Sequence, residues 1–156
     1  MIKRLFALLF VFLFVIGCTN SQETPEQKPV GFITFTMDDN WQIINETETE
    51  IEIEKTDSKD LSKLFFGLVK DVSPKEQVEK WLETYPDSKQ LDNITINNIE
   101  YLVVEKTTDE GKYMYLSTSY GDFNEEAKGT IIIEISIAIV DDVKAMLETL
   151  VINKEQ

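Results

Sequence analysis

Histidine is absent from the 156-residue sequence, and cysteine occurs once, as Cys18. Histidine is the commonest general base and the commonest metal ligand, so its absence removes the usual means of acid–base catalysis. Zinc sites built from nitrogen and sulfur ligands are excluded as well. A lone cysteine also leaves no partner for an intramolecular disulfide.

Glycine is scarce: the 6 glycines never cluster into a phosphate-binding loop. No serine lies in a Gly-x-Ser-x-Gly nucleophile elbow. Among 29 acidic residues some carboxylates must lie close together, so a glycosidase-like pair is neither excluded nor specifically indicated. We therefore expect no enzyme activity and no cofactor, with a small hydrolase as the remaining catalytic alternative.

Basic residues are few, with 15 Lys and Arg against 29 Asp and Glu and a formal net charge of −14. A chain this acidic repels nucleic acid and anionic lipid head groups. We expect no nucleic-acid partner and no membrane contact through the protein surface itself. Hydrophobic residues make up 42% of the chain, which is enough for a packed core.

The first 17 residues have the features of a secretory leader. Lys3 and Arg4 precede residues 5–16, a run without polar side chains. As a helix this run rises about 18 Å, which is too short for a hydrocarbon core of about 30 Å. A basic start followed by a short apolar run is typical of a signal peptide.

The end of the leader, Val15-Ile16-Gly17-Cys18, resembles the lipobox of bacterial lipoproteins. This resemblance implies that residues 1–17 are a lipoprotein signal peptide, removed before Cys18, and that Cys18 carries fatty acids. The protein would then be extracytoplasmic, held at the cell membrane or outer membrane by its acyl chains. An uncleaved anchor helix and an ordinary signal peptide are the alternatives.

The rest of the chain is long enough for one ordinary domain. Residues 18–30 are polar and contain Pro25 and Pro29, so we interpret them as a flexible tether. Residues 31–153 are expected to form a single domain in which strands predominate. Alternating or continuous apolar patterns predict strands at 33–37, 41–45, 64–69, 94–96, 99–107, 112–120 and 130–140. The strand that begins at 41–45 either runs on or bends into residues 46–56.

Two helices are expected within this domain. Ser73-Pro74-Lys75-Glu76 has the form of a capping box with proline at the first helical position, and the helix should end before Pro86. Asp141 or Asp142 is expected to cap a helix near the C-terminus. Because the strands are joined by hairpin turns, we predict an α+β fold with an antiparallel sheet of about six to eight strands packed with helices.

The order of these elements resembles that of PsbP-like domains. The likeness rests on the turn from Asp38 to Trp41, the mid-chain helix, the Asn97-Asn98 hairpin and the C-terminal helix. The family includes the photosystem II extrinsic protein PsbP and the eukaryotic Ran-nucleotide release factor. The resemblance implies an antiparallel sheet flanked by helices that acts by binding a partner. It assigns no functional residue to any position of this chain.

The most unusual local feature is a row of alternating glutamates: Glu46, Glu48, Glu50, Glu52 and Glu54. At the period of a strand all five project from one face, while Ile51 and Ile53 project from the other. The row is expected to be a solvated outer face whose charge discourages edge pairing. A surface for cations or for a basic partner is the functional alternative.

Calcium has weak candidate ligands in Asp122, Asn124 and Glu126, because hard cations prefer clustered oxygen ligands. Ala127 and Ile133 stand where an EF-hand loop needs glycine and glutamate, so an acidic connecting loop is the simpler interpretation. We thus expect a membrane-anchored, non-catalytic binding module with a protein partner. A divalent-cation-binding surface protein is the alternative.

Replacing Cys18 with alanine should abolish acylation, because the chain has no other thiol. Metabolic labelling with a tagged fatty acid measures the modification directly. We expect label on the unchanged chain and none on Cys18→Ala, which should keep its leader or be cut elsewhere. Undiminished labelling of the variant would contradict the lipobox assignment.

Overall fold

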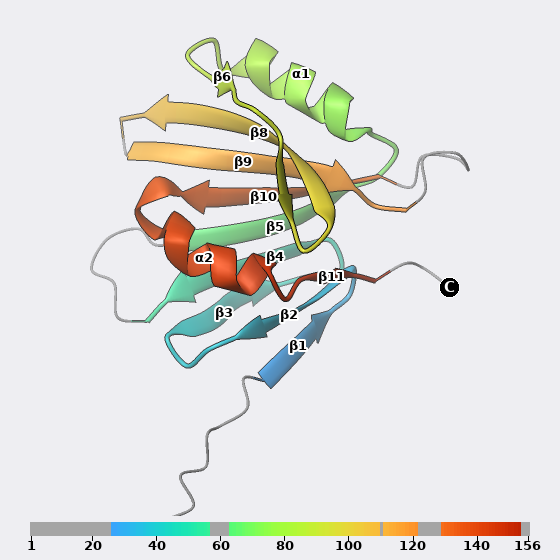
Figure 1. The fold of residues 1–156 in the computed structure, drawn as a ribbon, viewed down its shortest axis with the longest axis vertical. Coiled ribbons are helices and arrows are strands. Elements are labelled where there is room, and N and C mark those ends of the chain that lie inside the picture. The colour runs from blue at the N-terminus through green and yellow to red at the C-terminus, as the bar shows by residue number, and fades with distance from the viewer. Residues whose placement is uncertain (1–25, 57–62, 110, 122–128, 154–156) are drawn as a thin grey trace, which may run out of the picture.

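The computed structural model describes residues 26–56, 63–109, 111–121 and 129–153. This part of the chain forms an 8-stranded sheet, a 3-stranded sheet and two α-helices (Figure 1). Every strand pairing in it is antiparallel. The predicted α+β class with an antiparallel sheet is therefore confirmed.

The large sheet has the strand order β3-β4-β5-β10-β9-β8-β6, with β7 paired to β8. Its strands are β3 (Trp41–Glu46), β4 (Glu50–Lys55), β5 (Lys63–Val69), β6 (Lys89–Gln90), β7 (Ile94–Ile96), β8 (Ile99–Thr108), β9 (Gly111–Ser119) and β10 (Thr130–Ser136). The small sheet consists of β1 (Glu26–Val30), β2 (Ile33–Met37) and β11 (Val151–Ile152). The helices are α1 (Pro74–Thr84) and α2 (Val140–Leu147), the latter preceded by the 3₁₀ turn η1 (Ile137–Ile139).

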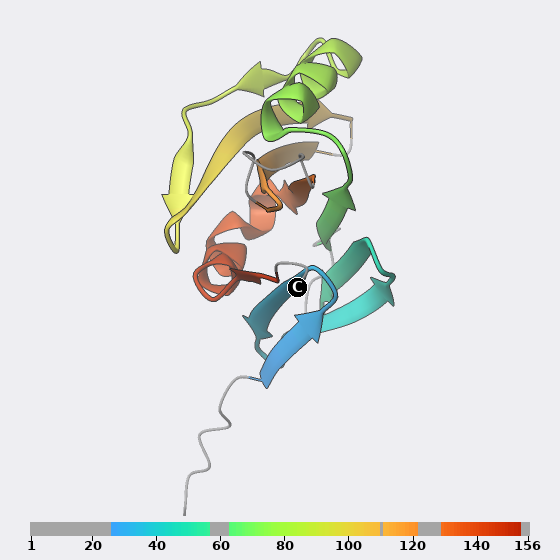
Figure 2. The same cartoon turned by 90° about the vertical axis from the view of Figure 1, so that its right-hand side faces the viewer.

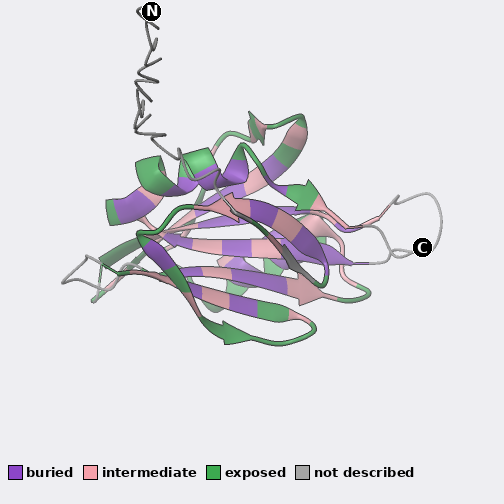
Figure 3. Ribbon diagram, turned by 90° about the horizontal axis from the view of Figure 1, so that it is seen from below, coloured by how far each residue is buried: buried purple, intermediate pink, exposed green. Residues whose placement is uncertain are grey.

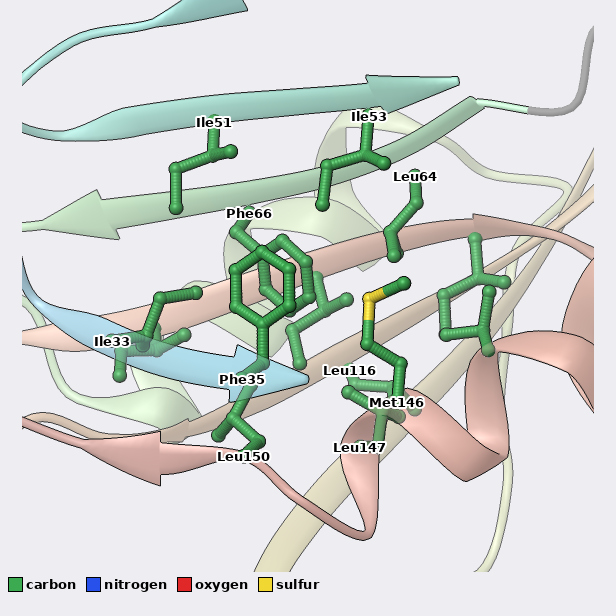
Figure 4. Packing of buried hydrophobic residues seen from close by; sticks show 14 of the residues in the cluster. Ile33, Phe35, Ile51, Ile53, Leu64, Phe66, Leu116, Met146, Leu147 and Leu150 are labelled. Atoms are coloured by element: carbon green, nitrogen blue, oxygen red, sulfur yellow. The ribbon is translucent and has the colours of Figure 1, made fainter. Parts of the chain in front are cut away.

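The inner face of the large sheet carries the main core. The small sheet, α2 and the β7–β8 hairpin lie over this face (Figures 1 and 2). Side chains of β4 and β5 point toward β2 and α2 in Figure 4, and the rings of Phe35 and Phe66 stack with centroids 5.4 Å apart. Burial alternates along the strands (Figure 3), because successive side chains point to opposite faces.

The outer face is covered by α1 over β8, β9 and β10. Val78 and Trp81 are the apolar side chains that α1 buries there, and they pack on Val104 and Tyr115. The rings of Trp81 and Tyr115 lie 4.9 Å apart between centroids. This second, smaller core fixes the helix on one half of the sheet.

Two buried hydroxyls hold the beginning of α1 on the same face. Ser117 Oγ of β9 donates a hydrogen bond to the carbonyl oxygen of Pro74 over 3.4 Å, and Thr130 Oγ1 of β10 donates to that of Val72. Both side chains are fully buried, so each needs such an acceptor. Strands β9 and β10 thereby determine where the helix starts.

The capping box predicted for α1 is confirmed. Ser73 Oγ accepts from the backbone N–H of Glu76 over 3.2 Å, and Glu76 Oε2 accepts from the backbone N–H of Ser73 over 2.9 Å. The backbone bond from Ser73, followed by the side-chain bond, holds the pKa of Glu76 below its usual range. The helix ends at Thr84, before Pro86, as predicted.

The Asn97-Asn98 turn also forms as predicted. Both asparagines have positive φ angles, 49° and 60°, which asparagine tolerates better than most residues. The turn joins β7 to β8, whose register pairs Ile96 with Ile99.

The C-terminal helix differs from the prediction in how it begins. β10 ends at Ser136, and Ile137 and Ile139 belong to the 3₁₀ turn η1 rather than to the strand. Asp141 and Asp142 lie in the first turn of α2 and do not cap it, because the helix continues directly from η1 with Ile139 at its N-cap. The carboxylates still lie near the positive end of the helix dipole.

Strand β1 belongs to the segment 18–30 that the sequence suggests is a tether. Its backbone pairs with β2, with Pro29 opposite Thr34 and Val30 opposite Ile33. A proline is compatible with this edge position because it lacks only the backbone donor. Residues 26–30 thus belong to the fold, and residues 18–25 lie outside the described part.

The described elements provide one another with hydrogen-bond partners and packing contacts. The strand pairings, the two apolar cores and the bonds that fix α1 are all made within residues 26–153. The main core joins residues of both sheets and of α2. Neither helix in it has the length and apolar character that a membrane crossing requires.

Candidate functional site

The five glutamates of the row do not lie on one continuous strand. Glu46 ends β3, Glu48 lies in the following turn, and only the last three belong to β4. The backbone N–H of Thr47 donates to the carbonyl oxygen of Glu50 over 2.8 Å, and Thr47 Oγ1 accepts from the backbone N–H of Glu50 over 3.0 Å. The prediction of one shared face is wrong for Glu46 and Glu48, because this turn folds the chain into a hairpin.

A register shift between Ile43 and Asn45 places Glu46 opposite Ile51 and Asn45 opposite Glu52. Residues directly opposite one another share a face, so Glu46 lies on the other side of the sheet from Glu52. The remaining row is Glu50, Glu52 and Glu54 on β4. It alternates with two isoleucines that are 0% exposed on the inner face.

The outer face beside β4 carries a half-buried aromatic side chain between carboxylates. The register places Glu52 opposite Phe65 of β5, and Phe65 opposite Glu134 of β10. We call this surface the acidic face and define it by Glu50, Glu52, Glu54, Phe65, Ile132 and Glu134. Its part on β4 and β5 lies beyond β8, β9 and β10, the strands on which α1 packs, while Ile132 of β10 also packs against the smaller core under α1. Lys63 of β5 lies opposite Glu54 of β4 in the strand register, so its positive charge offsets part of the negative charge at that end of β4.

Gly67 determines how Phe65 lies. A Cβ atom at Gly67 would be 2.8 Å from Cε1 of Phe65 and 3.0 Å from Cγ1 of Ile132. The ring of Phe65 therefore occupies the space above Gly67, and Ile132, which lies opposite Gly67 in the strand register, borders the same space. A side chain at position 67 would displace the ring, so the glycine allows Phe65 to lie over the strand.

Glu134 lies directly opposite Tyr115 of β9 in the strand register. Burial, then the negative charge of Glu134 and the hydrogen bond to it, raise the pKa of Tyr115 above its usual range. Tyr115 thus stays a neutral donor to Glu134.

The ammonium nitrogen of Lys106 lies 3.5 Å from the ring centroid of Tyr85 and 5.7 Å from that of Tyr115, close enough for a cation–π interaction.

On the inner face a pocket of about 300 Å³ lies between the β7–β8 hairpin, strands β9 and β10, and α2. Its walls are mostly apolar, with Ile94 and Ile96 from β7, Met114 and Leu116 from β9, and Leu147 from α2. Thr95 and Lys144 are the polar side chains among those that line it. The pocket is thus an apolar hollow with a cationic group at its wall.

The hydroxyl of Tyr101 is buried in the main core without a hydrogen-bond partner among the described residues. Burial raises the pKa of Tyr101 to about 12. The phenol therefore stays neutral at physiological pH.

Several residues singled out in the sequence lie outside the described residues. These are Cys18 and the calcium candidates Asp122, Asn124 and Glu126. Within the described ranges, no group of three or more acidic or cysteine side chains is placed to hold a metal ion. Glu50, Glu52 and Glu54 in particular do not converge, because they are spaced along one strand.

Sequence patterns did not single out Phe65, Glu134 and Lys144 as candidates for a functional site. Phe65 lies in an apolar run in which both faces of β5 are hydrophobic, so periodicity could not separate them. Of these three residues, only Glu134 had a usable sequence signal, because it is a charged residue within the isoleucine-rich strand β10. Lys144 looks like an ordinary solvated residue of an amphipathic helix.

Comparison with known proteins supports the fold and leaves the family open. No protein-family model matches the chain, and no curated protein matches it by sequence. Among solved structures, the Ran-binding protein Mog1p of Saccharomyces cerevisiae has a similar fold, with 11% identity, a TM-score of 0.50, and coverage of 84% of this chain and 97% of that one. The PsbP-like architecture that the sequence resemblance implied therefore agrees with a solved structure.

Two bacterial proteins are also similar at TM-scores below 0.5. A protein of Bacteroides thetaiotaomicron has 12% identity and a TM-score of 0.48; 81% of this chain is covered, but only 47% of that one. LpqN of Mycobacterium tuberculosis, described as involved in cell envelope biogenesis, has 10% identity, a TM-score of 0.47, and coverage of 85% and 87%. This chain thus spans about half the length of the Bacteroides protein.

Two neighbouring substitutions on β4 test the assignment of its faces. Glu52→Lys should change the free energy of unfolding by no more than about 0.5 kcal/mol, because it removes no core contact. Ile53→Glu should lower it by about 3–5 kcal/mol, because it places an unpaired charge at a fully buried position. Thermal and urea unfolding of a chain that begins at residue 19 would measure both. If Glu52→Lys unfolded the domain while Ile53→Glu left it stable, the side chains assigned to the inner face of β4 would instead lie on the outer face.

Proposed function

We propose that this protein is a lipid-anchored, extracytoplasmic and non-catalytic module that binds a basic protein partner through the acidic face. The observation that carries the proposal is Phe65, a half-buried ring between Glu52 and Glu134 on the half of the sheet that lies beyond α1. An aromatic side chain at the centre of a charged surface is typical of a binding hot spot.

The charges of the acidic face favour a cationic partner. None of Glu50, Glu52 and Glu54 forms an ion pair within the described part of the chain. Lys63, opposite Glu54, is the cation nearest to them in the strand register. Side chains directly opposite one another across a sheet are about 5 Å apart, so the negative potentials of Glu52 and Glu134 overlap above Phe65.

An arginine of the partner fits this arrangement better than a lysine. A guanidinium group stacks on an aromatic ring and also donates in its own plane to carboxylates. Phe65 provides the ring, and Glu52 and Glu134 provide acceptors on its two sides. Tyr115 lies directly opposite Glu134 in the strand register and stays neutral, so it can donate to this carboxylate and lower the ordering cost of binding.

Three further arguments bear on the proposal. The lipobox at Val15 to Cys18 would place the domain at a membrane surface, where a tethered module meets its partner at high effective concentration. The fold is compatible with protein binding, since Mog1p is a Ran-binding protein. The acidic composition favours electrostatic steering of a basic protein toward this surface.

Site-specific photocrosslinking in the native host would test the proposal. A benzoylphenylalanine in place of Phe65 keeps an aromatic ring at the centre of the acidic face. We expect illumination of isolated membranes to give a discrete protein adduct from position 65. No adduct is expected from the same group at Lys75, an exposed position on α1 with 82% of its side chain accessible.

Charge reversal distinguishes specific binding from chance contact. Glu52→Lys should remove the adduct, whereas the matched control Glu83→Lys, on the exposed side of α1, should retain it. An adduct of equal yield in both variants would show that the acidic face does not select its partner by charge. No adduct from position 65 would overturn the proposed site.

A further inference from the structure

The pocket on the inner face leaves apolar surface incompletely covered. Ile94, Ile96, Met114 and Val140 are only partly buried although they pack against the main core. Protein interiors are normally close-packed, so a hollow of about 300 Å³ is an exception. Its volume lies at the lower end of the range for small-molecule sites.

The pocket has a defined wall on the side of the hairpin. Nδ2 of Asn97, at the tip of the β7–β8 hairpin, donates to the carbonyl oxygen of Leu150 over 3.0 Å. The segment that follows α2 therefore holds the tip. The opposite wall is the sheet itself, at Met114 and Leu116.

Lys144 brings a positive charge to this apolar site. It lies in the last turn of α2, with Asp141 three positions before it and Glu148 four positions after it. Neither carboxylate forms an ion pair with Lys144, and its ammonium group is paired with no described residue. A lysine can pack its stem along an apolar wall while its charge remains at the rim.

We infer that the pocket binds a small aliphatic carboxylate, with the hydrocarbon chain inside and the carboxylate paired with Lys144. At about 30 Å³ for each water-sized group, 300 Å³ accommodates on the order of ten non-hydrogen atoms. This corresponds to the tail of a medium-chain fatty acid. The two long tails of a membrane phospholipid would not fit.

This site is separate from the acidic face. The pocket opens on the inner side of the sheet, and Phe65 with its glutamates lies on the outer side. The inference therefore does not depend on the proposed protein partner.

Calorimetric titration with decanoate, below its micelle concentration, tests the inference on a chain that begins at residue 19. We expect saturable binding of one decanoate per chain and a rise in the melting temperature, because the ligand binds the folded state only. Acetate, which lacks the tail, and decyltrimethylammonium, which has the opposite charge, should not bind. Absence of saturable decanoate binding, or equal binding of the ammonium compound, would overturn the inference.

Two variants with matched controls locate the site. Ile96→Phe fills the pocket and should abolish decanoate binding while the chain remains folded. Ile44→Phe, at an exposed isoleucine of β3, should bind normally. Binding that persists in Ile96→Phe would place the ligand elsewhere and contradict the inference.

Lys144→Met keeps an apolar stem and removes the charge. It should weaken decanoate about fivefold, as expected for a partly exposed ion pair, and leave decanol unchanged. The control Lys80→Met, on α1, should affect neither ligand. The role of Lys144 would be contradicted if the variant bound decanoate and decanol equally more weakly, or if it bound both as well as the unchanged chain does.

Vesicles of phosphatidylglycerol test whether the ligand is a phospholipid instead. Binding to these vesicles without binding of decanoate would contradict the inference that the pocket accepts only a single medium-length tail.

Discussion

The two-sided burial of β10 is the constraint on which the rest of the structure depends. Its inner side chains, Ile131, Ile133 and Ile135, are at most 2% exposed in the main core. On its outer side Thr130 bonds to the segment before α1, and Ile132 lies between α1 and Phe65. The strand is paired with β5 on one edge and β9 on the other, so both cores share one rigid support.

Unequal covering of this sheet produces both proposed binding surfaces. On the outer side α1 packs over β8, β9 and β10, and the acidic face lies beyond it. On the inner side the small sheet and α2 close most of the core (Figure 4), and the β7–β8 hairpin leaves the pocket beside Lys144. Each surface therefore has a rigid strand floor, which favours preorganised binding.

Local signals predicted the elements well. Ser73 and Glu76 form the capping box, and Asn97 and Asn98 form the turn, because both features depend on nearby residues only. The end of β10 was missed because the alternation of isoleucines continues through Ile137 and Ile139, which also suits a 3₁₀ turn. The pattern allowed either a continuous strand or a bend after Asn45, and the hairpin at Thr47 could not be chosen over the strand because it contains neither glycine nor proline. The pairing of Phe65 with Glu134 depends on strand register between distant segments, which no local pattern reveals.

Amide hydrogen exchange, followed by NMR on a chain that begins at residue 19, tests the central role of β10 most directly. The backbone amides that β10 donates to β5 and β9 should exchange only through global unfolding, because they are bonded on both edges of the strand. Amides of β7, a three-residue strand paired only with β8, should exchange faster through local opening. Protection in β10 no greater than in β7 would contradict the account.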